Sequence, residues 1–187
     1  MEEKREPECL LFDEIFVLIA SIDHPYKYGV ALAGLAGLRA GEIMGLKWKD
    51  IEFLGDEKGK ITIERQMDTE GKIVPPKSES CKATLPMVKP LTKLLEVFRT
   101  TRPDDREYLF QNEDERIGDW WNKNIRGKLV PADMRFHDLR QSFALNLVYK
   151  GVTILMIKKL MRHSDLQTTF DAYKHMMQEI DIWDLDI

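Results

Sequence analysis

Residues 26–46 read YKYGVALAGLAGLRAGEIMGL and contain the most strongly buried segment that the sequence predicts. The part from 26 to 38 has one charged residue, Lys27, and no polar face at helical spacing. Such a pattern indicates a helix that is covered on all sides by other elements. After Arg39, residues 40–46 predict a second, short helix. We therefore expect the core to form around residues 26–38.

The segments on either side of this stretch have different periodicities. Residues 9–22 predict a helix that Pro25 ends, and residues 48–54, 60–67 and 83–87 are typical of β-strands, with a turn-forming sequence at 55–59. Further expected helices span 91–100, 114–124, 138–150, 153–161 and 167–175. This order predicts an α+β fold, mainly helical with a small three-stranded antiparallel sheet, in one domain over residues 1–187.

The composition excludes several classes of protein. The 187 residues are 43% hydrophobic and 32% charged, which is typical of a globular protein. No apolar run reaches the ~18 to 20 residues that a membrane span needs, and the acidic start does not resemble a secretory signal. We therefore expect a cytoplasmic protein without membrane contact. Cys9 and Cys81 are too few for a disulfide framework or a zinc site. Glycine-rich phosphate loops and HExxH or GxSxG motifs are also missing from the sequence, so no cofactor or metal is predicted.

The net charge of −4 argues against a nucleic-acid partner, but its distribution reverses this argument. Residues 1–24 carry −5 and residues 176–187 carry −4, so residues 25–175 carry +5. Within them, residues 122–164 hold nine Lys and Arg against two Asp. This is the sign that a phosphate backbone requires. The candidate DNA contacts are Lys123, Arg126, Lys128, Lys158, Lys159 and Arg162.

Residue types suited to metal-free phosphoryl transfer occur on separate segments: Arg39, Lys77, His137, Arg140, His163 and Tyr173. Two guanidinium groups bind the non-bridging oxygens of a pentavalent phosphate bidentately. A tyrosine nucleophile, with its pKa of ~10, needs a nearby base or cation, and His137 is a candidate base. A lysine ammonium such as that of Lys77 can protonate the leaving alkoxide.

The motifs around these residues resemble the catalytic domain of tyrosine recombinases, the lambda-integrase family of phage and transposon integrases. Residues 36–43, AGLRAGEI, followed by 46–51, LKWKDI, resemble the segment with the first catalytic arginine, and residues 76–78 with 82–86 resemble the hairpin with the catalytic lysine. Residues 137–140, HDLR, resemble the HxxR box, and residues 163–175 resemble the segment with the last histidine and the nucleophile. Each motif is weak alone, but the order of all four is specific.

The resemblance implies the catalytic-domain fold of this family and a site-specific recombinase, typical of mobile elements. Such an enzyme breaks and rejoins double-stranded DNA through a 3′-phosphotyrosine, here on Tyr173, without ATP or metal. It implies that Arg39, Arg140 and His163 hold the phosphate, that Lys77 is the general acid, that His137 assists proton transfer, and that Glu42 supports the arginines. It also implies recombinase protomers as partners, two on a site and four in a synapse.

Several points of the comparison stay open. The family commonly has Gly before its last histidine, whereas Arg162 here either contacts DNA or alters the turn that carries His163. Lys82 is a second lysine in the same hairpin and is the alternative to Lys77 as the catalytic lysine, although the spacing between the lysine and Pro86 favours Lys77. We expect the family's amino-terminal core-binding domain to be absent. The tail, residues 176–187, is expected to pack on its own domain or on a neighbouring protomer.

The main rival function is a catalytically silent DNA-binding or regulatory relative with the same fold. The six intact residues argue against it, because a silent relative has no chemical reason to keep all of them. Ordinary structural roles are the alternative for single residues: Arg39 capping a helix, for example, or Tyr173 packing in the core. A small α+β interaction module is a third possibility, which would leave these residues without a common purpose.

Overall fold

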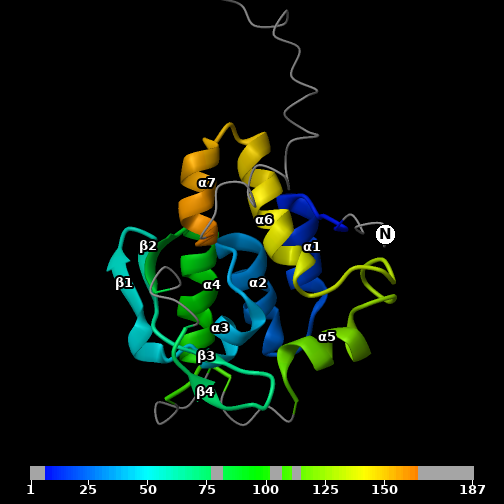
Figure 1. Cartoon of the computed structure of the whole chain (residues 1–187), viewed down its shortest axis with the longest axis horizontal. Helices are drawn as coiled ribbons and strands as arrows, with labels where there is room; N and C mark the ends of the chain where they lie inside the picture. Colours follow the sequence, from blue (N-terminus) through cyan, green and yellow to red (C-terminus); the bar gives the residue numbers. More distant parts are fainter. Residues whose placement is uncertain (1–6, 77–81, 102–106, 111–114, 164–187) are drawn as a thin grey trace, which may run out of the picture.

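The computed structural model describes residues 7–76, 82–101, 107–110 and 115–163 (Figure 1). The first helices are α1 (Phe12–Ser21), α2 (Tyr26–Ala36) and α3 (Ala40–Gly45), followed by the 3-10 helix η1 (Trp48–Asp50). The strands are β1 (Ile51–Gly55), β2 (Lys58–Ile63), β3 (Gln66–Met67), β4 (Ile73–Val74) and β5 (Ala83–Met87). The last helices are α4 (Lys89–Thr100), α5 (Ile117–Asn124), α6 (Asp138–Tyr149) and α7 (Ile154–Met161).

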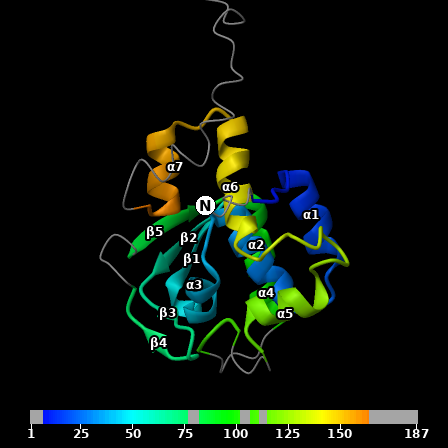
Figure 2. The same ribbon diagram turned by 45° about the vertical axis from the view of Figure 1, so that its right-hand side comes forward.

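Helix α2 lies at the centre of the molecule, with α1, α4 and α6 packed around it (Figures 1 and 2). Every residue of α2 except Lys27 is buried, which confirms the prediction of a fully covered helix. Its small side chains let neighbours approach closely. A Cβ atom on Gly29 would lie only 2.2 Å from Cδ1 of Ile117 in α5. The apolar composition of α2 is therefore a consequence of packing on all its faces.

The predicted antiparallel sheet is confirmed, with strand order β1-β2-β5. Ile51 pairs with Ile61, and Ile61 pairs in turn with Leu85, so their side chains share the face that joins the core. Asp56 and Glu57, both with positive φ, form the turn between β1 and β2. The turn is therefore narrower than the predicted segment 55–59. Helix α4 packs against this sheet through β2.

The predicted strand 60–67 is wrong as a single element. Strand β2 ends at Ile63, and Gln66–Met67 pairs instead with β4 as a separate two-stranded ribbon. The break follows from tertiary contacts, because Arg65 leaves the sheet to form an ion pair with Asp50. The ribbon then passes against α3, where a Cβ atom on Gly41 would lie 2.5 Å from the Met67 carbonyl oxygen.

The remaining helices agree with the predicted ones to within three residues, and the predicted helix 167–175 lies outside the described residues. Thr153 caps α7 by accepting a hydrogen bond from the Met156 amide. Helices α6 and α7 pack on each other through a small apolar cluster of Phe143, Ala144, Ile157 and Met161. In the described part of the chain, no helix has the length and apolar character of a membrane span.

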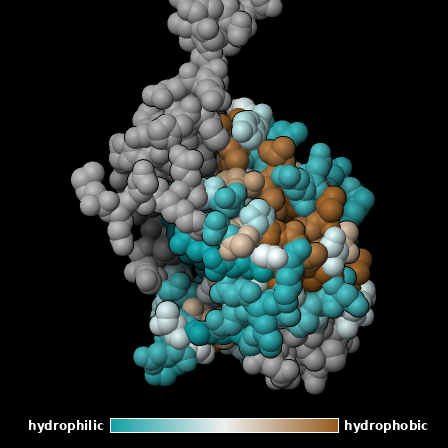
Figure 3. All heavy atoms as spheres, turned by 90° about the vertical axis from the view of Figure 1, so that its right-hand side faces the viewer, coloured by the Kyte–Doolittle hydropathy of each residue, from teal (hydrophilic) through white to brown (hydrophobic). Residues whose placement is uncertain are grey.

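The face of the molecule drawn in Figure 3 carries a band of apolar side chains between polar regions. Phe16 and Val17 of helix α1 and Leu11, just before it, are among the exposed apolar residues, while Ile15, Leu18 and Ile19 of the same helix are buried. The exposed fraction of Val17 is 67%. Isolated apolar residues at the surface are common in globular proteins, so this face alone indicates no particular partner.

Candidate active site

The candidate site lies where the end of α2, the start of α3, the start of α6 and the end of α7 meet. Gly37 closes α2 in the left-handed conformation, with φ of +66°. A Cβ atom at this position would lie 2.7 Å from a ring carbon of Phe143 and 3.2 Å from the sulfur of Met161. Glycine is therefore required both by the backbone conformation and by the close approach of α6 and α7.

Arg140 connects three of these elements. Its side chain is 1% exposed, Nη1 donates a hydrogen bond to the Gly37 carbonyl oxygen, and Nη2 donates one to the Met161 carbonyl oxygen. These two acceptors are the last groups of α2 and α7, whose carbonyls lack partners within their own helices. Arg140 thus holds the ends of α2 and α7 against the first turn of α6.

Arg39 and Glu42 form a second contact at the start of α3. The Arg39 amide donates to Oε2 of Glu42 at 2.8 Å, and Arg39 Nη1 donates to Oε1 at 2.8 Å. The Arg39 side chain is 33% exposed, whereas the Glu42 side chain is 2% exposed. Burial alone would raise the pKa of Glu42, but Arg162, the Arg39 amide and the Arg39 guanidinium lower it overall. Glu42 is therefore a buried carboxylate that fixes the more exposed Arg39.

Arg162 reaches the same carboxylate from the end of α7. Its Nη2 donates to Oε2 of Glu42 at 2.6 Å and to the Gly37 carbonyl oxygen at 3.2 Å, and Nη1 donates to the Leu160 carbonyl oxygen at 2.9 Å. The residue is 4% exposed. The Arg162 guanidinium is therefore directed into the protein, toward Glu42 and two backbone carbonyls, and the DNA contact predicted for it stays a prediction. The Arg162 backbone has φ of +52°, so it does shape the turn before His163.

Two imidazole rings complete the cluster. His137 precedes the first turn of α6 and reaches solvent, whereas His163 is half-buried. Burial and the charges of Arg140, Arg39 and Arg162 lower the pKa of His163 to about 4. Desolvation together with Arg140 and Arg39 also lowers the pKa of His137. Both rings are therefore neutral at pH 7 and can accept a proton or a hydrogen bond.

We call this group the arginine junction. It consists of residues connected by hydrogen bonds, ion pairs or close charges: Arg39, Glu42, His137, Arg140, Arg162 and His163. Four of the six predicted catalytic residues are thus brought together from three separate segments. Lys77 and Tyr173 lie outside the described residues. The alternative lysine, Lys82, is exposed just before β5.

The predicted surface cations fall into two groups. Lys123 and Lys128 are exposed at the end of α5, where Lys128 Nζ donates to the Lys123 carbonyl oxygen at 2.7 Å. Arg126 in the same loop is half-buried and donates to the Ala132 carbonyl oxygen. Lys158 and Lys159 belong to α7, which lies on the other side of the molecule from α5 (Figures 1 and 2). The positive segment 122–164 is thus not one continuous patch.

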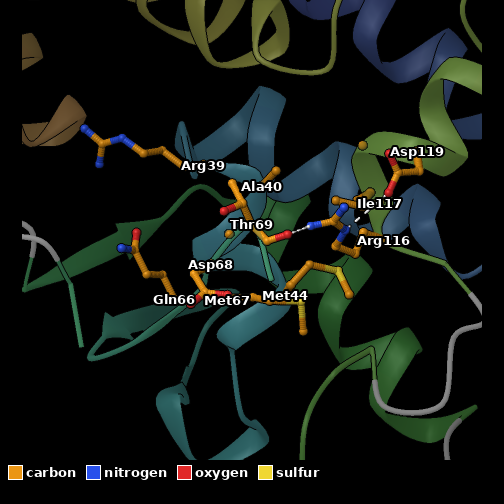
Figure 4. Close-up of a pocket in the computed structure, with 12 residues that line it drawn as sticks. Arg39, Ala40, Met44, Gln66, Met67, Asp68, Thr69, Arg116, Ile117 and Asp119 are labelled. Atoms are coloured by element: carbon orange, nitrogen blue, oxygen red, sulfur yellow. Dashed lines mark hydrogen bonds and ion pairs between the residues drawn. The ribbon is translucent and has the colours of Figure 1, made fainter. Parts of the chain in front are cut away.

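A pocket of about 540 Å³ lies beside the junction. It is lined by the start of α3, by β3 with the two residues after it, and by the start of α5, where Arg116 donates to the Thr69 carbonyl oxygen at 2.6 Å (Figure 4). Arg39 lies at its edge, with its guanidinium directed away from the other labelled residues. No motif in residues 66–69 or 116–119 indicated this pocket. Among the described residues, no group of three or more His, Cys, Asp or Glu could hold a metal ion.

Sequence reasoning missed the burial of Arg162 and its pairing with Glu42. A charged residue in a turn is normally exposed, and only the tertiary structure shows where such a side chain points. The available signal was that the family commonly has Gly where this chain has Arg162. Gly is the residue that adopts positive φ without strain, so an unusual backbone at Arg162 could have been expected.

Comparisons with known sequences assign the chain to a family. The model described as "Phage integrase family" matches residues 9–179. Among curated proteins, the chain is similar to the ICEBs1 integrase of Bacillus subtilis (strain 168), with 27% identity over 88% of this chain and 49% of that protein. It is also similar to tyrosine recombinase XerA of Pyrococcus horikoshii, with 28% identity over 89% of this chain and 56% of that protein. The chain therefore spans about half the length of these relatives.

Comparison with solved structures agrees. The Tn1549 transposon integrase, solved with circular intermediate DNA, superposes with a TM-score of 0.69 at 19% identity, over 97% of this chain and 70% of that one. The crystal structure of XerA recombinase gives a TM-score of 0.67 at 24% identity, over 95% of this chain and 65% of that one. These likenesses confirm the predicted fold class. Because the family model matches most of the chain, the protein belongs to the phage integrase family.

Proposed function

We propose that this chain is the catalytic domain of a tyrosine-type site-specific recombinase, which cuts and rejoins double-stranded DNA through a phosphotyrosine on Tyr173. The observation that carries the proposal is the convergence of Arg39, His137, Arg140 and His163 in the arginine junction. The names of relatives, an integrase and a tyrosine recombinase, support this reaction class. The transposon integrase solved with DNA supports DNA as the substrate.

The electrostatics of the junction suit an anion. Arg162, Arg39 and Arg140 lie close enough to the carboxylate of Glu42 to lower its pKa, and Arg140 and Arg39 also help to lower the pKa of both imidazoles. A phosphodiester entering beside Arg39 would relieve this excess of positive charge. Arg39, Arg140 and His163 would hold its non-bridging oxygens and stabilise the charge that these gain in the pentavalent transition state.

The reaction itself balances without an external reagent. The Tyr173 oxygen forms a bond to phosphorus while the bond from phosphorus to the 5′ oxygen breaks, which leaves a 3′-phosphotyrosine and a 5′-hydroxyl. His137, neutral at pH 7, would assist removal of the tyrosine proton, and Lys77 would protonate the leaving 5′ oxygen. A 5′-hydroxyl from another strand then reverses the step. The phosphodiester bond energy is retained in the covalent link.

The wider setting follows from the family. Lys158 and Lys159 on α7 would contact the DNA backbone, and so would Lys123 and Lys128 on the other side of the molecule, with Arg126 as a weaker candidate because its guanidinium already binds the Ala132 carbonyl. Further protomers would assemble as two on one site and four in a synapse, in the cytoplasm of a host that carries the mobile element. Residues 1–187 would act as the catalytic part, with the tail 176–187 packing in cis or in trans.

A nicked-DNA assay tests the proposal. The protein is incubated with a pool of nicked duplexes that have randomised flanks, and complexes that survive denaturation are recovered and sequenced. A nick lets the released 5′ fragment diffuse away, so that the covalent intermediate accumulates. We expect a protein–DNA adduct with the wild-type chain and none with Tyr173→Phe.

The rival function predicts a different result. A silent DNA-binding relative would retain DNA without an adduct, and its binding would weaken steeply with salt because only phosphate contacts hold the complex. Salt-sensitive retention without an adduct across the whole pool would therefore replace the recombinase proposal with the regulatory one. An adduct that persists in Tyr173→Phe would remove Tyr173 as the nucleophile.

A further inference from the structure

Arg162 has a backbone conformation that does not suit its residue type. Its φ of +52° lies in the left-handed region that glycine adopts at helix ends. In the described part of the chain, the other non-glycine residues with positive φ are Asp56 and Glu57, which form the exposed hairpin turn after β1. Arg162 instead ends a helix inside the protein. A strained backbone persists only where the surrounding contacts over-determine it. We therefore expect contacts of the Arg162 side chain to offset this strain.

The side chain makes that compensation through its two terminal nitrogens. Nη2 contacts Oε2 of Glu42 at 2.6 Å and the Gly37 carbonyl oxygen at 3.2 Å, and Nη1 contacts the Leu160 carbonyl oxygen at 2.9 Å. The side chains of Arg162 and Glu42 are 1% and 2% exposed. The contact joins residues that are 120 positions apart in the chain. It is therefore a buried tertiary connection and not a local cap.

Both of its distant acceptors are shared with a candidate catalytic arginine. Glu42 also accepts hydrogen bonds from the amide and from Nη1 of Arg39. The Gly37 carbonyl also accepts a hydrogen bond from Nη1 of Arg140. The Arg162 guanidinium is thus linked to Arg140 through one shared oxygen atom, and to the Arg39 guanidinium through the carboxylate of Glu42. It also lies directly before His163, whose pKa its charge helps to lower.

We propose that Arg162 is a positioning residue, which sets the orientation of Arg39 through Glu42 and of Arg140 through the Gly37 carbonyl. The inference rests on the proposed function for the meaning of that orientation. Arg162 touches no substrate, and its planar fork is the feature that matters, because the bond from Nη1 to the Leu160 carbonyl fixes the plane in which Nη2 binds Glu42 and the Gly37 carbonyl. A buried ion pair contributes little to stability relative to apolar residues of similar size, so a role in geometry explains its presence better.

Three variants separate geometry from stability. Arg162→Lys keeps the charge and removes the fork, and Arg162→Gly removes the side chain and relieves the backbone. Arg65→Lys is the matched control, since Arg65 is also a largely buried partner of a carboxylate, Asp50, but lies outside the junction. Each is tested for the single-turnover rate of adduct formation at saturating nicked DNA, and for the affinity for the same DNA.

We expect both Arg162 variants to lower the rate of adduct formation about 10- to 100-fold. This range is typical of residues that orient a reactive group without contacting the substrate. The DNA affinity should change less than about threefold, because Arg162 is buried. Arg65→Lys should keep the wild-type rate. A wild-type rate in Arg162→Gly would overturn the proposal, as would an equal loss in Arg65→Lys. If a variant fails to fold, Glu42→Gln, which keeps the shape of its side chain, should lose the rate instead.

A second measurement works without DNA. The NMR signals of the Arg39 side chain should shift in Arg162→Lys and stay in place in Arg65→Lys. Unchanged Arg39 signals in Arg162→Lys would contradict the proposal by themselves. If the wild-type chain forms no adduct, the proposed function fails, while these spectra still decide whether Arg162 positions Arg39. The two failures are therefore distinguishable.

Discussion

Two buried arginine–carboxylate pairs in this molecule have the same chemistry and different surroundings. In the arginine junction, Arg162 pairs with Glu42, and both side chains are at most 2% exposed. On the sheet side, Arg65 pairs with Asp50, with side chains 12% and 3% exposed. Arg65 also pairs with Glu64, which is half-exposed at 52%. The first pair is thus closed off from water, and the second extends to the surface.

The two carboxylates differ in the other groups from which they accept hydrogen bonds. Asp50 accepts the Lys47 amide at 2.9 Å and so caps η1, which is a local task. Glu42 accepts both the amide and the guanidinium of Arg39, which ties a buried cation to an exposed one. Burial of an ion pair therefore does not by itself indicate a functional site. What singles out the junction is that its buried pair shares its acceptors with Arg39 and Arg140, the two arginines that we propose to bind the phosphate.

Among the tests of this comparison, removal of each carboxylate should give the largest change in the free energy of unfolding. Glu42→Ala leaves Arg162 buried without its carboxylate, and we expect the free energy of unfolding to fall by about 3–5 kcal/mol. Asp50→Ala should cost about 1–3 kcal/mol, because Arg65 keeps Glu64 and some contact with water. Urea denaturation of both variants measures the difference. Equal losses would show that the two pairs are equivalent.

Two glycines with positive φ give a smaller contrast. Gly37→Ala combines backbone strain with overlap onto the Phe143 ring, so we expect a loss of about 2–4 kcal/mol. Gly71, with φ of +83° in the loop of the β3–β4 ribbon, has no atom within 4 Å of a Cβ position. Gly71→Ala should therefore cost about 1 kcal/mol, from the backbone alone. Thermal denaturation measures both, and a Gly37→Ala variant as stable as Gly71→Ala would refute the close packing of α2, α6 and α7.

The pH dependence of stability should come from the junction and is the smallest of these effects. The pKa of His163 is about 4 in the folded chain, below its ordinary value of 6.5, so the unfolded chain binds more protons between these values. Stability should therefore fall as the pH drops from 7 toward 4, and the lowered pKa values of His137 and Glu42 act in the same direction.

Urea midpoints at pH 7 and pH 5 measure this loss, and His163→Asn should reduce it. Residues 47–87 contain no histidine, so Arg65→Lys should leave the pH dependence unchanged. A midpoint in the wild-type chain that does not move between the two pH values would argue against a depressed pKa at His163.

The two regions also differ in how much of them the sequence could predict. The burial of α2 followed from its lack of a polar face, and the HDLR motif correctly indicated that His137 and Arg140 lie at the same end of one helix. Their meeting with Arg39 and His163 came from the family resemblance, because local patterns carry no information on contacts between distant segments.

The sheet side shows where local patterns fail. Ile61, Ile63 and Met67 continue an alternating pattern, which predicted one strand over 60–67. The contact of Arg65 with Asp50 interrupts that strand, and alternation alone does not reveal such a contact. The same holds for Arg162, whose residue type indicated an unusual turn but not that its guanidinium is buried against Glu42.

We propose above all that the arginine junction holds the DNA phosphate that Tyr173 attacks. The most direct test of this proposal is peptide mapping by mass spectrometry of the adduct formed on nicked duplex DNA after nuclease and protease digestion. We predict a nucleotide attached through its 3′ phosphate to the peptide that contains Tyr173, and a much lower yield of this peptide from Arg39→Lys. A nucleotide attached to any other residue, or an equal yield from Arg39→Lys, would contradict the account.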